Sequence, residues 1–219
     1  MPRPGLTVIC DFDGTVTTAD IGYALCERFA PGVLARADER WRAGEVSFHD
    51  AYRIACLELT APHEEMVGHA LEVAVVRDGF LELVETCVSG GVELIVASAG
   101  IDLYVEPVLR RHLGALRDRI EVRANAGTIT SGGVAVTFPH LHPDCAACGN
   151  CKGLHARRAQ AEGRVVIGVG DSHTDACLAG QVQHLFARTW LAEHCRGRGI
   201  MHHAYDDFHP VVRLVRDIR

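Results

Sequence analysis

Apolar runs and segments of helical periodicity alternate along most of the chain. Short runs rich in β-branched residues are typical of buried strands in a parallel sheet, and they lie at residues 6–10, 92–97, 165–169 and 185–187. Apolar residues recur at helical spacing between and after these runs, at 80–88, 102–113 and 152–161, and again in an amphipathic segment at the end of the chain. This alternation predicts an α/β fold with a doubly wound, Rossmann-like parallel sheet.

Residues 18–76 interrupt the alternation, because they carry helical signals and no convincing strand. Ile21–Phe29 has apolar residues at helical spacing. Ser47 stands three residues before an acid and is a candidate helix start. We therefore predict a small helical cap of residues 18–76 inserted after the first strand, and an α/β hydrolase core made of 1–17 and 77–219.

Two more elements are predicted in the second half of the chain. Strand-like runs at 120–124 and 128–137 contain turn residues, which predicts a hairpin around Ser131-Gly-Gly133. The segment Gly170-Asp-Ser-His-Thr-Asp175 follows a buried strand and is predicted to lead into another helix.

Composition and charge exclude several classes of protein. The 219 residues suffice for one α/β domain with an insert, and a net charge of −6 argues against binding to a nucleic-acid backbone. No apolar run approaches the roughly 18 residues of a membrane span. Nine cysteines, an odd number, make a disulfide framework improbable, so we expect a cytoplasmic protein.

Polar side chains follow three of the predicted strands. They are Asp11 and Asp13, then Ser98, then Asp171 and Asp175. Because the carboxyl ends of parallel strands meet at one edge of a sheet, we expect these side chains to converge there. Clustered carboxylates repel one another unless a cation is present, and Mg²⁺ prefers oxygen ligands. Lys152 opens a predicted helix nearby and can add positive charge against a phosphate.

Four motifs in this order resemble the haloacid dehalogenase superfamily of phosphohydrolases. They are Asp11-Phe-Asp-Gly-Thr15, Ser98 after a strand, Lys152, and Gly170-Asp-Ser-His-Thr-Asp175. The resemblance covers nearly the whole chain. It implies a phosphatase that uses Mg²⁺, acts on a small-molecule phosphate ester and works through an aspartyl-phosphate.

The resemblance also implies a role for each residue. Asp11 attacks phosphorus, Asp13 protonates the leaving oxygen and then activates water, and Ser98 and Lys152 hold the phosphoryl group. The implied magnesium ligands are Asp11, the backbone carbonyl of Asp13, and Asp171, with Asp175 beside them. A haloacid dehalogenase needs neither Asp13 nor a metal, so the second Asp favours phosphate chemistry.

Within the superfamily, an insert after the first motif resembles the phosphoserine phosphatase type of cap. The segments Cys148-Gly-Asn-Cys-Lys152 and Tyr205-Asp-Asp-Phe208 resemble a closer branch. That branch contains 2-hydroxy-3-keto-5-methylthiopentenyl-1-phosphate phosphatase of methionine salvage and the phosphoethanolamine/phosphocholine phosphatases. We favour the methionine-salvage activity, with phosphoserine or amino-alcohol phosphates as the alternative. A phosphotransferase of the same fold, or a phosphate-binding module without catalysis, is the competing class.

The candidate substrate-binding residues are Asp20, Gly14, Thr15, Ala99 and Gly100. Asp20 lies where phosphoserine phosphatases have a substrate-facing Glu, which makes phosphoserine itself less suitable; Asp20 is equally able to cap a helix. We interpret His173, inside the fourth motif, as a bystander. The expected assembly is a monomer or a homodimer.

A cluster of soft-metal ligands precedes Lys152. His140, His142, Cys145, Cys148 and Cys151 fall within twelve residues. Three thiolates with one of the histidines would suit a tetrahedral structural zinc. The alternative is that Cys148 and Cys151 simply pack beside Lys152.

Overall fold

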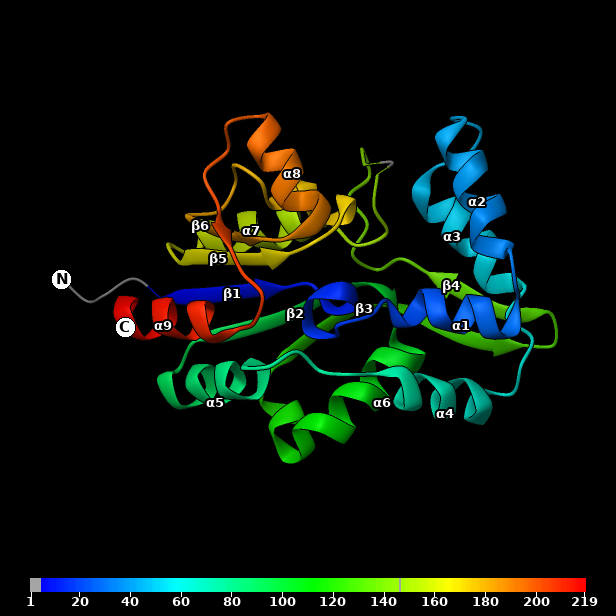
Figure 1. The fold of residues 1–219 in the computed structure, drawn as a ribbon, viewed down its shortest axis with the longest axis horizontal. Helices are drawn as coiled ribbons and strands as arrows, with labels where there is room; N and C mark the ends of the chain where they lie inside the picture. Colours follow the sequence, from blue (N-terminus) through cyan, green and yellow to red (C-terminus); the bar gives the residue numbers. More distant parts are fainter. Residues whose placement is uncertain (1–4, 146) are drawn as a thin grey trace.

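A seven-stranded sheet forms the centre of the computed structural model, which describes residues 5–145 and 147–219 (Figure 1). The strand order within these residues is β4-β3-β2-β1-β5-β6-β7. All adjacent strands are parallel except β3 and β4, which form the predicted hairpin. The strands are β1 (Leu6–Cys10), β2 (Glu93–Ile101), β3 (Glu121–Thr130), β4 (Gly133–Thr137), β5 (Val165–Gly170), β6 (His184–Ala187) and β7 (His203–Ala204). The predicted α/β fold with a parallel sheet is confirmed.

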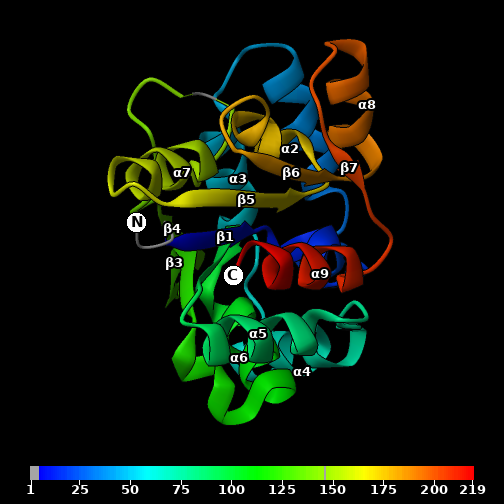
Figure 2. The ribbon, with the colours of Figure 1, turned by 90° about the vertical axis from the view of Figure 1, so that its left-hand side faces the viewer.

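Helices cover both faces of the sheet (Figure 2). On one face lie α5 (Phe80–Gly90), α6 (Asp102–Leu113) and α9 (His209–Ile218), and on the other lie α7 (Lys152–Ala161) and α8 (Thr189–Gly197). Each face has its own apolar core, because successive side chains of a strand point to opposite sides. In β1, Val8 and Cys10 pack in the core beside α5 and α6, whereas Ile9 packs in the core beside α7 and α8.

Four helices lie within residues 18–76, where the insert is predicted. They are α1 (Ile21–Phe29), α2 (Val33–Arg42), α3 (Phe48–Leu57) and α4 (His63–Val73). Ser47 caps α3, since its hydroxyl accepts a hydrogen bond from the Asp50 backbone N–H at 3.1 Å. Figure 1 shows α2 and α3 standing together beyond the carboxyl end of β1. The division into core and cap remains a prediction.

The chain after β5 differs from the prediction. The expected helix is one short turn, η3 (His173–Leu178), and its first residues form a capping box between Ser172 and Asp175. Helix α8 and strand β7 were not predicted from the sequence. Two other short turns lie at η1 (Phe12–Val16) and η2 (Gly114–Arg119). Among the described residues, no helix combines the length and the apolar character needed to cross a membrane.

Candidate active site

The two aspartates of the first motif follow β1 directly, where the chain makes a tight turn. Asp11 is buried, and its backbone N–H still donates to the Val169 carbonyl of β5 at 2.9 Å. Gly14 has φ of 78°, and a Cβ at this position would lie 2.5 Å from Asp171 Oδ2. Glycine is therefore required here both by the backbone conformation and by the approach of the Asp171 carboxylate.

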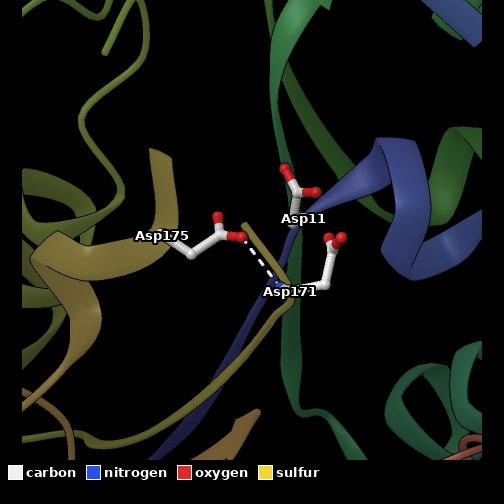
Figure 3. A group of neighbouring side chains, drawn as sticks. All are labelled: Asp11, Asp171 and Asp175. Carbon is white, nitrogen blue, oxygen red and sulfur yellow. Dashed lines mark hydrogen bonds between the residues drawn. The ribbon is translucent and has the colours of Figure 1, made fainter. Parts of the chain in front are cut away.

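Three carboxylates converge at this edge of the sheet, as predicted. One oxygen each of Asp11, Asp171 and Asp175 lies within 4.8 Å of the others. Figure 3 shows them reaching one space from β1, from the end of β5 and from η3. The dashed line in Figure 3 is the bond from the Asp171 backbone N–H to Asp175 Oδ2, at 2.9 Å.

Lys152 completes this group at the start of α7. Its Nζ lies 2.6 Å from Asp11 Oδ1 and 2.6 Å from Asp175 Oδ1, and the side chain is fully buried, with 0% exposed. Burial by itself lowers the pKa of Lys152, but the two carboxylates outweigh it, so that the pKa is raised well above its usual range. The ammonium therefore stays charged between the two acids.

The remaining negative charge makes this a suitable cation site. Burial, and then repulsion from Asp175, raises the pKa of Asp171 to about 6 and that of Asp11 well above its usual range. Three carboxylates against one ammonium leave an excess of negative charge, which a divalent cation would neutralise. The atoms available as metal ligands are all oxygens. The Thr15 hydroxyl orients one of them, Asp171 Oδ1, by donating a hydrogen bond to it at 2.8 Å. Such a set fits Mg²⁺.

Asp13 is not part of the group of three carboxylates and has its own partners. Asp13 Oδ1 accepts from the Ile21 backbone N–H at 2.9 Å, and Oδ2 accepts from the Tyr104 hydroxyl at 2.7 Å. The Ser98 hydroxyl lies 3.4 Å from the same Oδ2. Burial, and then the nearby charge of Asp20, raises the pKa of Asp13 to about 7. A carboxyl with this pKa can both donate and accept a proton near neutral pH.

The loop after β1 is fixed by a buried arginine. Arg77, just before α5, is only 8% exposed and donates to the backbone carbonyls of Gly14 and Thr15, both at 2.8 Å. It also reaches the Asp206 carbonyl at 3.1 Å, so it joins the first motif to the segment before α9. These bonds hold the turn that carries Asp13.

Arg77 and Tyr104 are residues that sequence reasoning missed. Tyr104 sits inside a predicted helix, and Arg77 ends an apolar run; only the folded chain shows that both reach the first motif. Two glycines give a partial signal: a Cβ on Gly100 would lie 1.7 Å from the Tyr104 hydroxyl, and one on Gly22 would lie 3.0 Å from it. Gly22 is far from Tyr104 in sequence, so this contact could not be identified from the sequence alone.

A cavity of about 480 Å³ opens over these groups. It is lined by most of the predicted site, namely Asp11, Asp13, Gly14, Asp20, Ala99, Gly100 and Asp171. Thr15, Ser98, Lys152 and Asp175 lie behind this lining and are buried. The exposed Asp20 caps α1 by accepting from the Tyr23 backbone N–H at 2.7 Å, so its alternative role as a helix cap is present. The opposite wall is formed by α2 and α3.

The structure does not support the predicted zinc site. Cys145 Sγ and Cys148 Sγ lie 3.5 Å apart, but His142 Nδ1 is occupied by the Asp144 backbone N–H, and the His140 ring packs against His155. In the described part of the chain, only the aspartate group brings three candidate ligand atoms within 4.8 Å of one another. The set His140, His142, Cys145, Cys148 and Cys151 is not brought together. Cys148 and Cys151 are buried beside α7, where they act as small apolar side chains.

The chain also matches a known protein family and individual known proteins. Residues 8–180 match the model of the haloacid dehalogenase-like hydrolases. A 2-hydroxy-3-keto-5-methylthiopentenyl-1-phosphate phosphatase of Bacillus velezensis is 30% identical over 96% of this chain and 90% of its own length. The enzyme of the same description from Brevibacillus brevis is 28% identical over 98% of this chain and 96% of its own length.

A solved phosphoserine phosphatase with a phospho-aspartyl intermediate analogue has a similar fold. Its TM-score is 0.72 with 17% identity, over 97% of this chain and 99% of that one. At this identity the similarity concerns the fold alone.

Proposed function

The chain belongs to the haloacid dehalogenase-like hydrolases, and from this we propose that it hydrolyses the phosphate monoester 2-hydroxy-3-keto-5-methylthiopentenyl 1-phosphate in methionine salvage. One observation supports the phosphatase chemistry above others: buried Lys152 bridges Asp11 and Asp175 beside Asp13, a carboxyl with a pKa of about 7. The substrate is proposed from relatives that align with almost the whole chain.

In the first step, an Asp11 carboxylate oxygen attacks phosphorus. A bond forms between this oxygen and phosphorus while the bond from phosphorus to the ester oxygen breaks. Asp13 donates its proton to the leaving oxygen, which departs as an alcohol or enol. Lys152 and Ser98 stabilise the charge on the transferring group.

In the second step, the aspartyl-phosphate is hydrolysed. Asp13, now a carboxylate, takes a proton from water, and the water oxygen bonds to phosphorus as the bond to Asp11 breaks. Inorganic phosphate leaves and Asp11 is regenerated. Tyr104 and the Ile21 backbone N–H hold Asp13 in place through both steps.

Mg²⁺ is the proposed cofactor. The residues that would hold it are Asp11, Asp171 and the Asp13 backbone carbonyl, with Asp175 beside them. When bound, it supplies positive charge against the phosphoryl oxygens. Thr15 and Asp175 orient the site, since they bond to Asp171 Oδ1 and to its backbone N–H.

Phosphate release with and without Mg²⁺ tests this function. We expect the wild type to turn over the salvage ester only with Mg²⁺, and Asp11→Asn to lose at least about 10³-fold in kcat, because the nucleophile is gone. Asp118→Asn changes an exposed acid far from the cavity and serves as the control. Unchanged turnover by Asp11→Asn would contradict its role as nucleophile.

The same assay separates the alternatives. Preferred turnover of phosphocholine, phosphoethanolamine or phosphoserine over the salvage ester would reassign the substrate. Transfer of phosphate to an added alcohol in place of water would indicate a phosphotransferase. We further infer a cytoplasmic protein, since its nine cysteines are free thiols, and a monomer or homodimer.

A further inference from the structure

The catalytic groups occupy one side of the cavity, and the wall opposite them has a different character. That wall consists of apolar and aromatic residues of α2 and α3: Leu34, Ala37, Trp41, Phe48, Ala51 and Tyr52. On each helix they recur every three or four residues, so each helix turns one apolar face toward the cavity. Some of the apolar residues that give the insert its helical periodicity therefore line the cavity.

Two aromatic rings bring this wall close to the acids. The Trp41 and Phe48 rings meet edge to face, with centroids 5.6 Å apart. Both also pack against His173, at 5.0 and 5.2 Å, and His173 lies in η3 between Asp171 and Asp175. An ester whose phosphoryl group lies at Asp11 therefore extends its other end toward these rings, since Asp11 and both rings line the same cavity.

The charges around the cavity do not favour a cationic tail. Asp38 is paired with Arg42 at 2.9 Å, and Asp20 caps α1. One face of the Trp41 indole is covered by His173, whose ring is nearly parallel to it at 30°. A site for a quaternary or primary amine needs open aromatic faces and unpaired carboxylates. Glu27 of α1 also lines the cavity, but it lies outside the α2–α3 wall, whose one lining acid, Asp38, is already paired.

We propose that the α2–α3 wall is a subsite for an uncharged, apolar tail that contains a thioether, and that Trp41 and Phe48 determine this specificity. The proposal rests on the phosphatase function above and adds the residues that select the substrate. A thioether suits the subsite because sulfur makes favourable contacts at the edges of aromatic rings. The wall disfavours a charged tail because its one lining acid, Asp38, is paired with Arg42 and its other lining side chains cannot replace the tail's water.

A panel of simple esters tests the subsite without the unstable natural substrate. We would compare 3-(methylthio)propyl phosphate with pentyl phosphate, which has the same length, and with phosphoethanolamine, phosphocholine and glycerol phosphate. We expect kcat/KM to be about 10- to 100-fold higher for the two apolar esters than for the two cationic ones. Equal or higher kcat/KM for the cationic esters would overturn the proposal.

Variants of Trp41 and Phe48 then test whether these two residues cause the preference for apolar esters. Trp41→Ala and Phe48→Ala should each lower kcat/KM for methylthiopropyl phosphate about 10-fold or more and leave glycerol phosphate within about twofold. Trp190→Ala is the matched control, because Trp190 also packs against His173, at 6.2 Å, but does not line the cavity. An equal loss on every ester would show a merely structural role.

Two further measurements separate this proposal from misfolding and from failure of the catalytic function. Trp41→Glu should raise kcat/KM for phosphoethanolamine relative to pentyl phosphate, a gain that a misfolded protein cannot give. Binding of the same esters to Asp11→Asn, followed by calorimetry, should show tighter binding of the apolar esters. If wild type hydrolysed none of the esters but this order of binding held, the catalytic function would fail and the subsite would stand. Binding that ignores the tail would overturn the subsite.

Discussion

At the scale of single residues, the hydrogen bond from Tyr104 to Asp13 bears on the proposed proton transfers. Burial and then the charge of Asp20 raise the pKa of Asp13, and the Tyr104 hydroxyl, which stabilises the carboxylate, offsets part of this rise, so that the net pKa is about 7. Tyr104→Phe removes this bond, and the pKa of Asp13 should rise further. The first step needs Asp13 protonated, so the alkaline limb of kcat/KM against pH should move to higher pH.

The control for this prediction is Tyr23→Phe. Tyr23 also lines the cavity, but its side chain is not among the partners of Asp13. Its pH profile should match that of the wild type. An alkaline limb that stays in place in Tyr104→Phe would show that Asp13 is not the acid.

Arg77 is the residue on which the turn after β1 depends. Arg77→Ala would leave the carbonyls of Gly14 and Thr15 buried without their donor. We expect the free energy of unfolding to fall by about 2 to 4 kcal/mol, measured by urea denaturation. Arg36→Ala removes an exposed pair with Glu58 and should cost less than about 1 kcal/mol. Similar losses in the two variants would contradict a structural role for Arg77.

The convergence of the aspartates could be predicted from the sequence and the contacts of Arg77 and Tyr104 could not, for a physical reason. Asp11 and Asp13 follow β1 and Asp171 follows β5, and strand ends meet in any parallel sheet. Ser98 was expected after a strand ending at residue 97, but it lies within β2, which extends to Ile101. Arg77 and Tyr104 act through contacts 62 to 91 residues away in sequence, which depend on how helices pack. Local patterns contain no trace of such contacts.

At the scale of elements, the β3–β4 hairpin supports α3. Gly133 has φ of 109°, and a Cβ there would lie 1.9 Å from the Leu57 carbonyl at the end of α3. Gly133→Ala should therefore lower the free energy of unfolding by about 1 to 3 kcal/mol, seen as a lower melting temperature. Its neighbour Gly132 is the matched control: its φ is not in the left-handed region, and a Cβ would meet only Thr130 Oγ1, at 3.9 Å.

Gly132→Ala should leave stability within about 0.5 kcal/mol of wild type. If the two variants melted together, the hairpin would have no role in placing α3. Because α3 carries Phe48, the Gly133→Ala variant should also lose part of the preference for apolar esters, whereas Gly132→Ala should keep it.

The elements that were predicted well contain apolar residues in a regular pattern over many positions, and those that were missed are short or polar. The strand at 165–169 and the helix at 152–161 were predicted closely, whereas the strand predicted at 92–97 extends to Ile101. The turn η3 was expected to be a longer helix, yet Asp175 bonds back to the backbone of Asp171 and Ser172 and fixes a tight turn. Helix α8 buries only a narrow stripe that includes Leu191 and Cys195, and this gives a weak signal.

At the scale of the whole molecule, folding brings together carboxylates from distant segments although these carboxylates repel one another. Asp11 follows β1 and Asp171 follows the neighbouring strand β5, whereas Lys152 begins α7 and Asp175 lies in η3. The pKa values of Asp11 and Asp171 are raised, which means that folding brings their charged forms into a less favourable place. The charged forms of Asp11 and Asp171 therefore oppose folding of the metal-free protein.

Because the ionised carboxylates disfavour folding, the stability of the metal-free protein should depend on pH. The pKa of Asp171 rises from 3.8 to about 6 on folding, so the folded state binds its proton more tightly. Without metal, the stabilising contribution of the protonated form is present below about pH 4 and is lost as pH rises to about 6. Asp171→Asn removes this charge and keeps an oxygen for Thr15, so at pH 8 it should melt above the wild type, and the difference should shrink at pH 5.

Mg²⁺ should reverse the order of the two proteins. A cation that binds only the folded state raises the melting temperature by mass action, and it does so only where the carboxylates are ionised. At pH 8, about 10 mM Mg²⁺ should therefore stabilise the wild type and leave Asp171→Asn nearly unchanged. The measurement is thermal unfolding of both proteins at pH 5 and pH 8, with EDTA and with Mg²⁺. An equal gain in both proteins would place the cation elsewhere, and a wild type more stable than Asp171→Asn in EDTA at pH 8 would show that the carboxylates do not oppose folding.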